Sequence, residues 1–118
     1  MLITLLKSKL HNARVTGANV KYEGSLGISR DLLEAVGLLP YEKVLVTNCN
    51  NGERLETYVI VEEDPGRIVL QGAAALKGKP GDRVIIMSFG RYTPEEAAEH
   101  HAKVAVLNKK NEIQDLRV

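Results

Sequence analysis

The sequence predicts a mainly β domain, either a small barrel or a sandwich, that carries two short helices. Its apolar residues fall mostly in short β-rich runs, and turn signals separate these runs. Short strands at this spacing are typical of barrels and sandwiches. Two segments break the pattern and have helical spacing with capping residues. The predicted strands are LITLL at 2–6, KVLVTN at 43–48, ETYVIV at 56–61, RIVL at 67–70, RVIIMSF at 83–89 and KVAVL at 103–107.

The first apolar run leads into a polar stretch and then into a helix. Lys9 and His11 alternate with their neighbours, so on a strand they share one face. In SRDLLEAVG, Ser29 can cap a helix and Gly37 suits its end. The residues that form the apolar face of this predicted helix are Leu32, Leu33 and Val36.

Turn signals organise the middle of the chain. Asn51-Gly52 lies between two strand-like runs and predicts a hairpin. Pro65-Gly66 and Pro80-Gly81 predict further turns. The small residues of QGAAALKGKPGD, at 71–82, predict a short helical turn and a loop whose main chain is accessible to a ligand.

A second helix is predicted in TPEEAAEHH. Thr93 can cap it, Pro94 suits its first position, and Glu96 completes a capping box. His100 and His101 are then expected in its last turn, where a cation suits the helix dipole. The C-terminal NKKNEIQDLRV is expected either to form an edge strand or to fray.

Composition limits the possible functions. The 118 residues fit a single domain over 1–118, and a net charge of +1 with 4% aromatic residues favours neither nucleic acid nor a membrane as partner. The lone Cys49 excludes an internal disulfide and fits a reducing compartment. No run approaches the roughly 20 apolar residues of a membrane span. We therefore expect a soluble, cytoplasmic protein.

Common catalytic signatures are absent or incomplete. GSLG around Ser25 lacks the G-x-S-x-G spacing of a serine hydrolase, so by itself the Gly-Ser pair is a turn. His100 and His101 are adjacent and face different directions on a helix, while His11 has no partner at metal-ligand spacing. No metal site is predicted. The nucleotide-binding glycine patterns are also missing.

Several short motifs nevertheless follow one another in a specific order. They are Lys9-Leu10-His11, Val15-Thr16, Tyr22-Glu23-Gly24-Ser25, Asn51-Gly52-Glu53-Arg54 with Thr57-Tyr58, Gly72-Ala73-Ala74-Ala75 and Pro80-Gly81-Asp82. Each motif is weak alone, but the set resembles the bacterial aspartate 1-decarboxylases over nearly the whole chain. These are pyruvoyl-dependent enzymes that make β-alanine.

The resemblance implies a fold and a maturation step. The implied fold is a small double-psi β-barrel that assembles as a homotetramer, with active sites between neighbouring subunits. The implied maturation is self-cleavage of the Gly24–Ser25 bond into chains 1–24 and 25–118, which converts Ser25 into a covalent pyruvoyl group. Gly24 would allow a strained backbone, and Thr57 would stabilise the oxyanion. Glu23 and His11 are candidates for proton handling.

The resemblance also implies the reaction. L-Aspartate would form a Schiff base with the pyruvoyl group and lose its α-carboxylate as CO₂, leaving β-alanine for pantothenate biosynthesis. Tyr58 would return the proton, because a phenol is protonated at neutral pH. Arg54 would bind the retained β-carboxylate, with Lys9 adding positive potential. The residues implied to contact substrate through their main chain are Gly72, Ala73 and Ala74.

Two departures and two alternatives accompany this interpretation. Gln71 stands where the family usually has Asn and carries its amide one methylene farther from the main chain, and Thr47 stands where many members carry an aromatic residue. One alternative is a non-catalytic barrel that binds a ligand, in which Arg54 would belong to an ion pair. The other is a pyruvoyl-dependent decarboxylase of another acidic amino acid.

Overall fold

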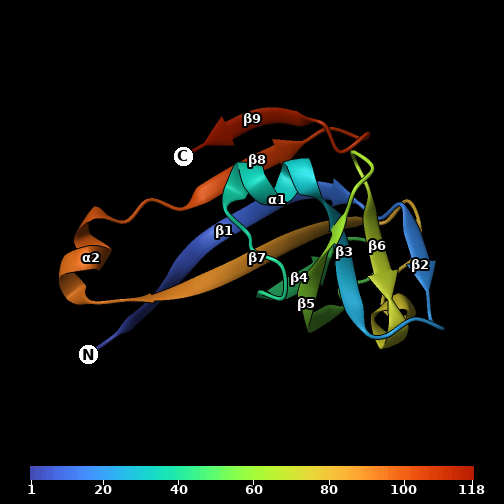
Figure 1. Ribbon diagram of the computed structural model, residues 1–118, viewed down its shortest axis with the longest axis horizontal. Helices are drawn as coiled ribbons and strands as arrows, with labels where there is room; N and C mark the ends of the chain where they lie inside the picture. The colour runs from blue at the N-terminus through green and yellow to red at the C-terminus, as the bar shows by residue number, and fades with distance from the viewer.

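The computed structural model covers residues 1–118 and contains one nine-stranded sheet, two α-helices and a 3₁₀ helix (Figure 1). The strand order is β2-β6-β3-β5-β4-β7-β1-β8-β9, and the pairs β1–β8, β2–β6 and β3–β5 are parallel. The prediction of a mainly β fold with two short helices is confirmed, and the arrangement is consistent with a small β-barrel. The elements are β1 Ile3–Arg14, β2 Gly17–Asn19, β3 Ser25–Ser29, α1 Arg30–Val36, β4 Lys43–Asn48, β5 Arg54–Glu62, β6 Ile68–Gln71, η1 Gly72–Leu76, β7 Arg83–Tyr92, α2 Pro94–Glu99, β8 Lys103–Leu107 and β9 Ile113–Arg117.

The strands depart from the prediction mainly near the N-terminus. β1 extends to Arg14, well beyond the predicted 2–6, because it pairs with β7 and in part with β8. β3 was not predicted, because its five residues are all buried and do not alternate between buried and exposed positions. β9 forms the edge strand that was one of the two outcomes expected for the C-terminal segment.

Helix α1 ends as predicted but begins differently. Gly37 adopts a left-handed conformation (φ 71°) that terminates the helix. Ser29 occupies the N-cap position, yet its side chain makes no capping hydrogen bond, and its buried hydroxyl has no partner. The predicted apolar face, Leu32, Leu33 and Val36, is buried.

Helix α2 carries the predicted capping box between Thr93 and Glu96. The prediction that His100 and His101 lie in its last turn is wrong, because the helix ends at Glu99 and His100 is extended. A tertiary contact accounts for this: His100 Nε2 lies 2.6 Å from the carbonyl oxygen of Leu6, and its ring packs on Tyr92 with centroids 4.3 Å apart. Neither helix is long and apolar enough to cross a lipid bilayer.

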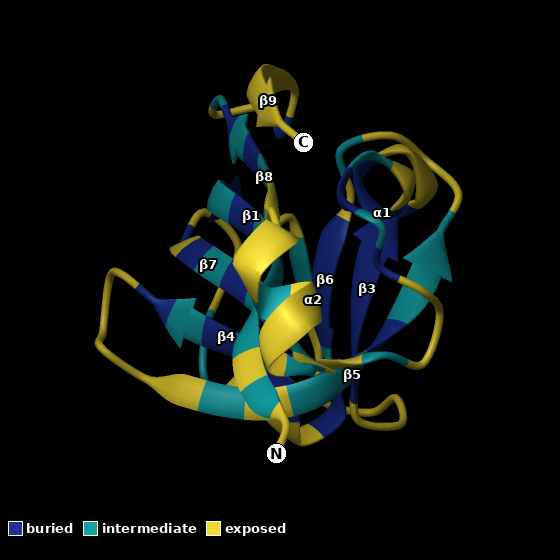
Figure 2. Cartoon of the chain, turned by 90° about the vertical axis from the view of Figure 1, so that its left-hand side faces the viewer, coloured by how far each residue is buried: buried dark blue, intermediate teal, exposed yellow.

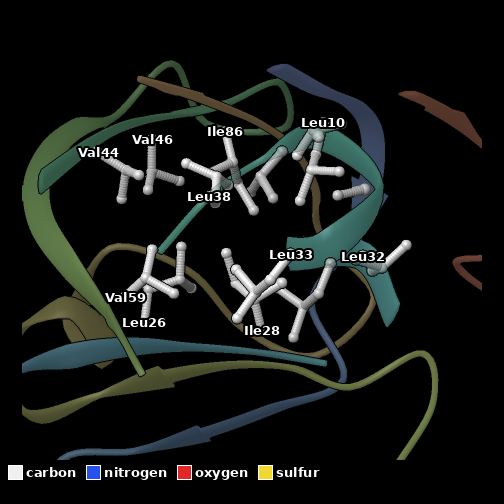
Figure 3. Packing of buried hydrophobic residues seen from close by; sticks show 14 of the residues in the cluster. Leu10, Leu26, Ile28, Leu32, Leu33, Leu38, Val44, Val46, Val59 and Ile86 are labelled. Atoms are coloured by element: carbon white, nitrogen blue, oxygen red, sulfur yellow. The ribbon is translucent and has the colours of Figure 1, made fainter. Parts of the chain in front are cut away.

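The core lies between the sheet and α1 (Figure 3). Leu33 of α1 points toward Ile28 of β3, and Leu32 is buried in the same apolar cluster. β3 is therefore held by two neighbouring strands and by its own buried side chains. This makes the start of β3 a rigid position. Helix α2, in contrast, is largely exposed (Figure 2).

Candidate active site

Ser25 is the first residue of β3 and is only 2% exposed. On one side it pairs with Gln71 of antiparallel β6, and on the other the Leu26–Val59 pair places Tyr58 of β5 next to it. The Ser25 hydroxyl lies 3.0 Å from Gln71 Oε1, to which it can donate a hydrogen bond, and 3.3 Å from the carbonyl oxygen of Glu23. Two strands and a side-chain amide thus fix this hydroxyl.

Two cavities flank the Gly24–Ser25 bond. The larger one, about 810 Å³, is lined by Ser25, Glu23, Gln71 and Tyr58 among others. The smaller one, about 360 Å³, reaches the other residue of the bond and is lined by Gly24, Leu55, Glu56, Thr57, Tyr58, Ala73, Ala74 and Lys77. Tyr58 lines both cavities. The structure therefore brings together most of the predicted site residues within one chain.

Gly72 packs directly against the segment that contains this bond. A Cβ added to Gly72 would lie 2.6 Å from both the Cα and the N of Gly24, and 2.8 Å from the carbonyl oxygen of Tyr22. Gly72 also has a positive φ of 67°, which disfavours any other residue. Only glycine allows η1 to approach residues 22–24 this closely.

Gly24 itself has the opposite environment. Its φ lies outside the left-handed region, and a Cβ added there would meet nothing within 4 Å. Gly24 therefore shows no left-handed backbone strain. The constraint that sequence reasoning assigned to Gly24 lies instead across the contact, at Gly72.

Lys9 and Arg54 lie away from these cavities. Lys9 lies between the buried Ser8 and Leu10 on β1, so it belongs to the outward face of the sheet. Arg54 of β5 pairs with Thr47 of β4, which lies between two buried residues, so Arg54 belongs to the same outward face. Neither side chain makes an ion pair within the chain, which leaves two cations free for an anion. An ion pair at Arg54, required by the binding-module alternative, is absent.

His11 also faces outward on β1, and it does not line either cavity. Burial, followed by the positive charges of Lys9, Arg83 and Arg117, lowers the pKa of its imidazole. Its Nδ1 is buried without a hydrogen-bond partner. Burial and the neighbouring cations therefore both disfavour the charged form of His11.

The profile of the aspartate decarboxylase family matches residues 1–114. The chain belongs to this family. Among its relatives, the aspartate 1-decarboxylase of Bacillus licheniformis is 52% identical over 117 residues, covering 98% of this chain and 92% of that protein. The aspartate 1-decarboxylase of Bacillus subtilis is 50% identical over 117 residues, with the same coverage. That of Salinibacter ruber is 49% identical over 118 residues, covering 99% of this chain and 81% of that protein. The family resemblance seen in the motifs is confirmed.

Two contacts in this member of the aspartate decarboxylase family were not predicted from the sequence. It marked Gln71 only as a departure from Asn, whereas the structure places its amide on the Ser25 hydroxyl. It also passed over Lys77, which lines the smaller cavity and contacts the β4–β5 turn. Both contacts join segments far apart in sequence, so no local pattern could have indicated them.

Proposed function

We propose that this protein is a cytoplasmic homotetrameric enzyme that decarboxylates L-aspartate to β-alanine and CO₂, supplying β-alanine for pantothenate biosynthesis. Its pyruvoyl group would come from Ser25 after self-cleavage of the Gly24–Ser25 bond. Membership of the aspartate decarboxylase family supports the reaction. The observation that most directly supports the site is the buried Ser25, which lines the larger of two cavities that share Tyr58, while Gly24 lines the smaller one.

Self-cleavage begins with Ser25 Oγ attacking the carbonyl carbon of Gly24. The new C–O bond replaces the C–N bond, so the amide becomes an ester, and the freed nitrogen takes up the hydroxyl proton. Thr57 faces the cavity beside Gly24 and is our donor for the oxyanion. Elimination then releases residues 1–24 as a carboxylate, and water replaces the nitrogen, which leaves as ammonia. Gln71 keeps the attacking hydroxyl in place before the first step.

The residues around Ser25 fit the group that this sequence of steps would form. The pyruvoyl group, once formed, supplies an electrophilic carbonyl that binds the substrate amine and accepts the electron pair left by CO₂. Ala73 and Ala74 line the smaller cavity, and their small side chains would let a ligand approach the main chain there. Tyr58 borders both cavities, and its phenol would donate the proton that replaces the lost carboxylate.

The substrate carboxylate would be bound by residues on the outward sheet face of a neighbouring subunit. Lys9 and Arg54 lie outside the cavities of their own chain and have no ion-pair partner there. In a homotetramer, this face of one subunit would pack over the Ser25 cavities of its neighbour. Arg54 would then bind the retained β-carboxylate, since an ion pair to the departing α-carboxylate would stabilise the substrate against reaction.

Intact-mass spectrometry of the denatured protein, combined with a β-alanine assay, tests this function. We expect two species corresponding to residues 1–24 and 25–118, with the larger one lighter by one ammonia than its serine form. β-Alanine should appear from aspartate only in the cleaved sample. Ser25→Ala is the control and should remain a single inactive chain. A wild-type chain that stays intact and produces no β-alanine would refute the proposal.

A further inference from the structure

The 3₁₀ helix η1 (Gly72–Leu76) is a weak element in an important place. It presents Ala73 and Ala74 to the smaller cavity and packs Gly72 against residues 22–24. A single 3₁₀ turn has poor hydrogen-bond geometry and little stability of its own. Its position must therefore be fixed by contacts outside the helix.

Ala74 of η1 belongs to the buried core, and Lys77, the C-cap residue of η1, supplies the polar contacts. Its backbone N–H donates to the carbonyl oxygen of Ala74 at 3.0 Å, which closes the helix. Its carbonyl oxygen accepts hydrogen bonds from Asn48 Nδ2 at 3.1 Å and from Asn51 Nδ2 at 3.0 Å. Its ammonium group lies 2.7 Å from Glu53 Oε2. One residue thus joins η1 to the end of β4 and to the β4–β5 turn (residues 49–53).

The β4–β5 turn is itself a fixed platform. The Asn48 side chain accepts from the Asn50 N–H at 2.8 Å, and the Asn51 side chain accepts from the Glu53 N–H at 2.9 Å. The Cys49 N–H and the Asn50 side chain connect the turn to Arg83 of β7. A contact to this turn can therefore hold η1 in place.

The side-chain amide of Asn48 also donates a hydrogen bond to Asp82. This buried carboxylate lies 3.0 Å from Asn48 Nδ2 and accepts the Lys79 N–H at 3.1 Å. Hydrogen bonds from Asn48 and Lys79 hold the pKa of Asp82 below its ordinary value. Both ends of segment 77–82 are thereby attached to the same asparagine.

We propose that Lys77 is a positioning residue that holds η1 against the β4–β5 turn, so that the main chain of Ala73 and Ala74 keeps its place beside Thr57. This inference rests on the proposed function of that cavity. The same turn leads directly into Arg54, so Lys77 joins the two substrate-recognition segments that each chain contributes.

The Lys77–Glu53 ion pair allows this role to be tested without unfolding the protein. Its side chains are 44% and 46% exposed, and pairs of this kind contribute little to global stability. Lys77→Met and Glu53→Gln should each raise the KM for aspartate about two- to five-fold while kcat stays within about two-fold. The exchanged pair Lys77→Glu with Glu53→Lys should restore KM to within about two-fold of wild type.

Glu63→Gln is the matched control, since it removes an exposed ion pair with Arg30 of similar length, 2.9 Å, far from η1. It should leave KM unchanged. Hydrogen exchange in a Ser25→Ala background provides a readout independent of activity: Lys77→Met should increase deuterium uptake across residues 72–77, and Glu63→Gln should not. The proposal is overturned if the single variants match the control in both KM and uptake, or if the exchanged pair is no better than either single variant. If wild type makes no β-alanine, the proposed function fails, and the exchange experiment still decides whether Lys77 holds η1.

Discussion

Replacing Gly72 with alanine should slow self-cleavage far more than it weakens the fold. The new Cβ would lie 2.6 Å from Gly24, whereas ordinary contact begins at 3.4 Å, so the segment before Ser25 must move by about 0.8 Å. A misplacement near 1 Å can cost about 100-fold in rate when reacting atoms must be aligned. The left-handed backbone at position 72 adds strain of about 1–2 kcal/mol.

Two measurements separate these effects. Intact-mass spectrometry over time should give a self-cleavage rate about 100-fold below wild type. Thermal unfolding in the Ser25→Ala background should show Tm lowered by roughly 4–10 °C. Gly81→Ala is the matched control, because Gly81 has a φ of 94° and nothing within 4 Å of an added Cβ. It carries left-handed strain without a clash, so it should lose less stability than Gly72→Ala and still cleave at nearly the wild-type rate.

The reasoning is refuted if Gly72→Ala cleaves as fast as Gly81→Ala. In that case the close approach of η1 to residues 22–24 would have no influence on the geometry of the bond.

Three further changes test other parts of the structure. Gln71→Leu removes the acceptor 3.0 Å from the Ser25 hydroxyl and should slow self-cleavage about two- to ten-fold, measured by intact mass; an unchanged rate would mean that this hydrogen bond does not position the nucleophile. Leu26→Ala should lower the free energy of unfolding by about 2–5 kcal/mol in urea titrations of the Ser25→Ala chain, because Leu26 is fully buried next to Ser25, and a loss below about 1 kcal/mol would contradict the packing. Asp82 has a lowered pKa, so its stabilising contribution is complete above about pH 4 and is lost as the pH falls through the folded-state value. Asp82→Asn should therefore weaken the dependence of the free energy of unfolding on pH at the acid end. An unaltered dependence would contradict a stabilising role for the Asp82 carboxylate.

Local signals explain what the sequence predicted correctly. Gly37 and the Thr93–Glu96 box act over a few residues, so they could be recognised without the fold. β1 was underestimated because its second half is polar, and β3 was overlooked because burial on both faces removes alternation.

In the site, too, local motifs could be recognised from the sequence, whereas contacts between distant segments could not. Motif order identified Ser25, Thr57 and Tyr58, and the fold does bring them to two adjoining cavities. The contact between Ser25 and Gln71 spans 46 residues and depends on strand register, which a motif does not specify. The separation of Arg54 from Ser25 became visible only once the strands were placed in one sheet.

The position of β1 has a consequence for the protein after cleavage. β1 is hydrogen-bonded between β7 and β8, and β2 pairs with β6, so under the proposed cleavage the 1–24 fragment would remain part of the sheet. A cleaved subunit is then a non-covalent complex of two peptides. Its refolding after denaturation becomes a bimolecular reaction whose yield depends on protein concentration, while an uncut Ser25→Ala chain refolds as a single molecule.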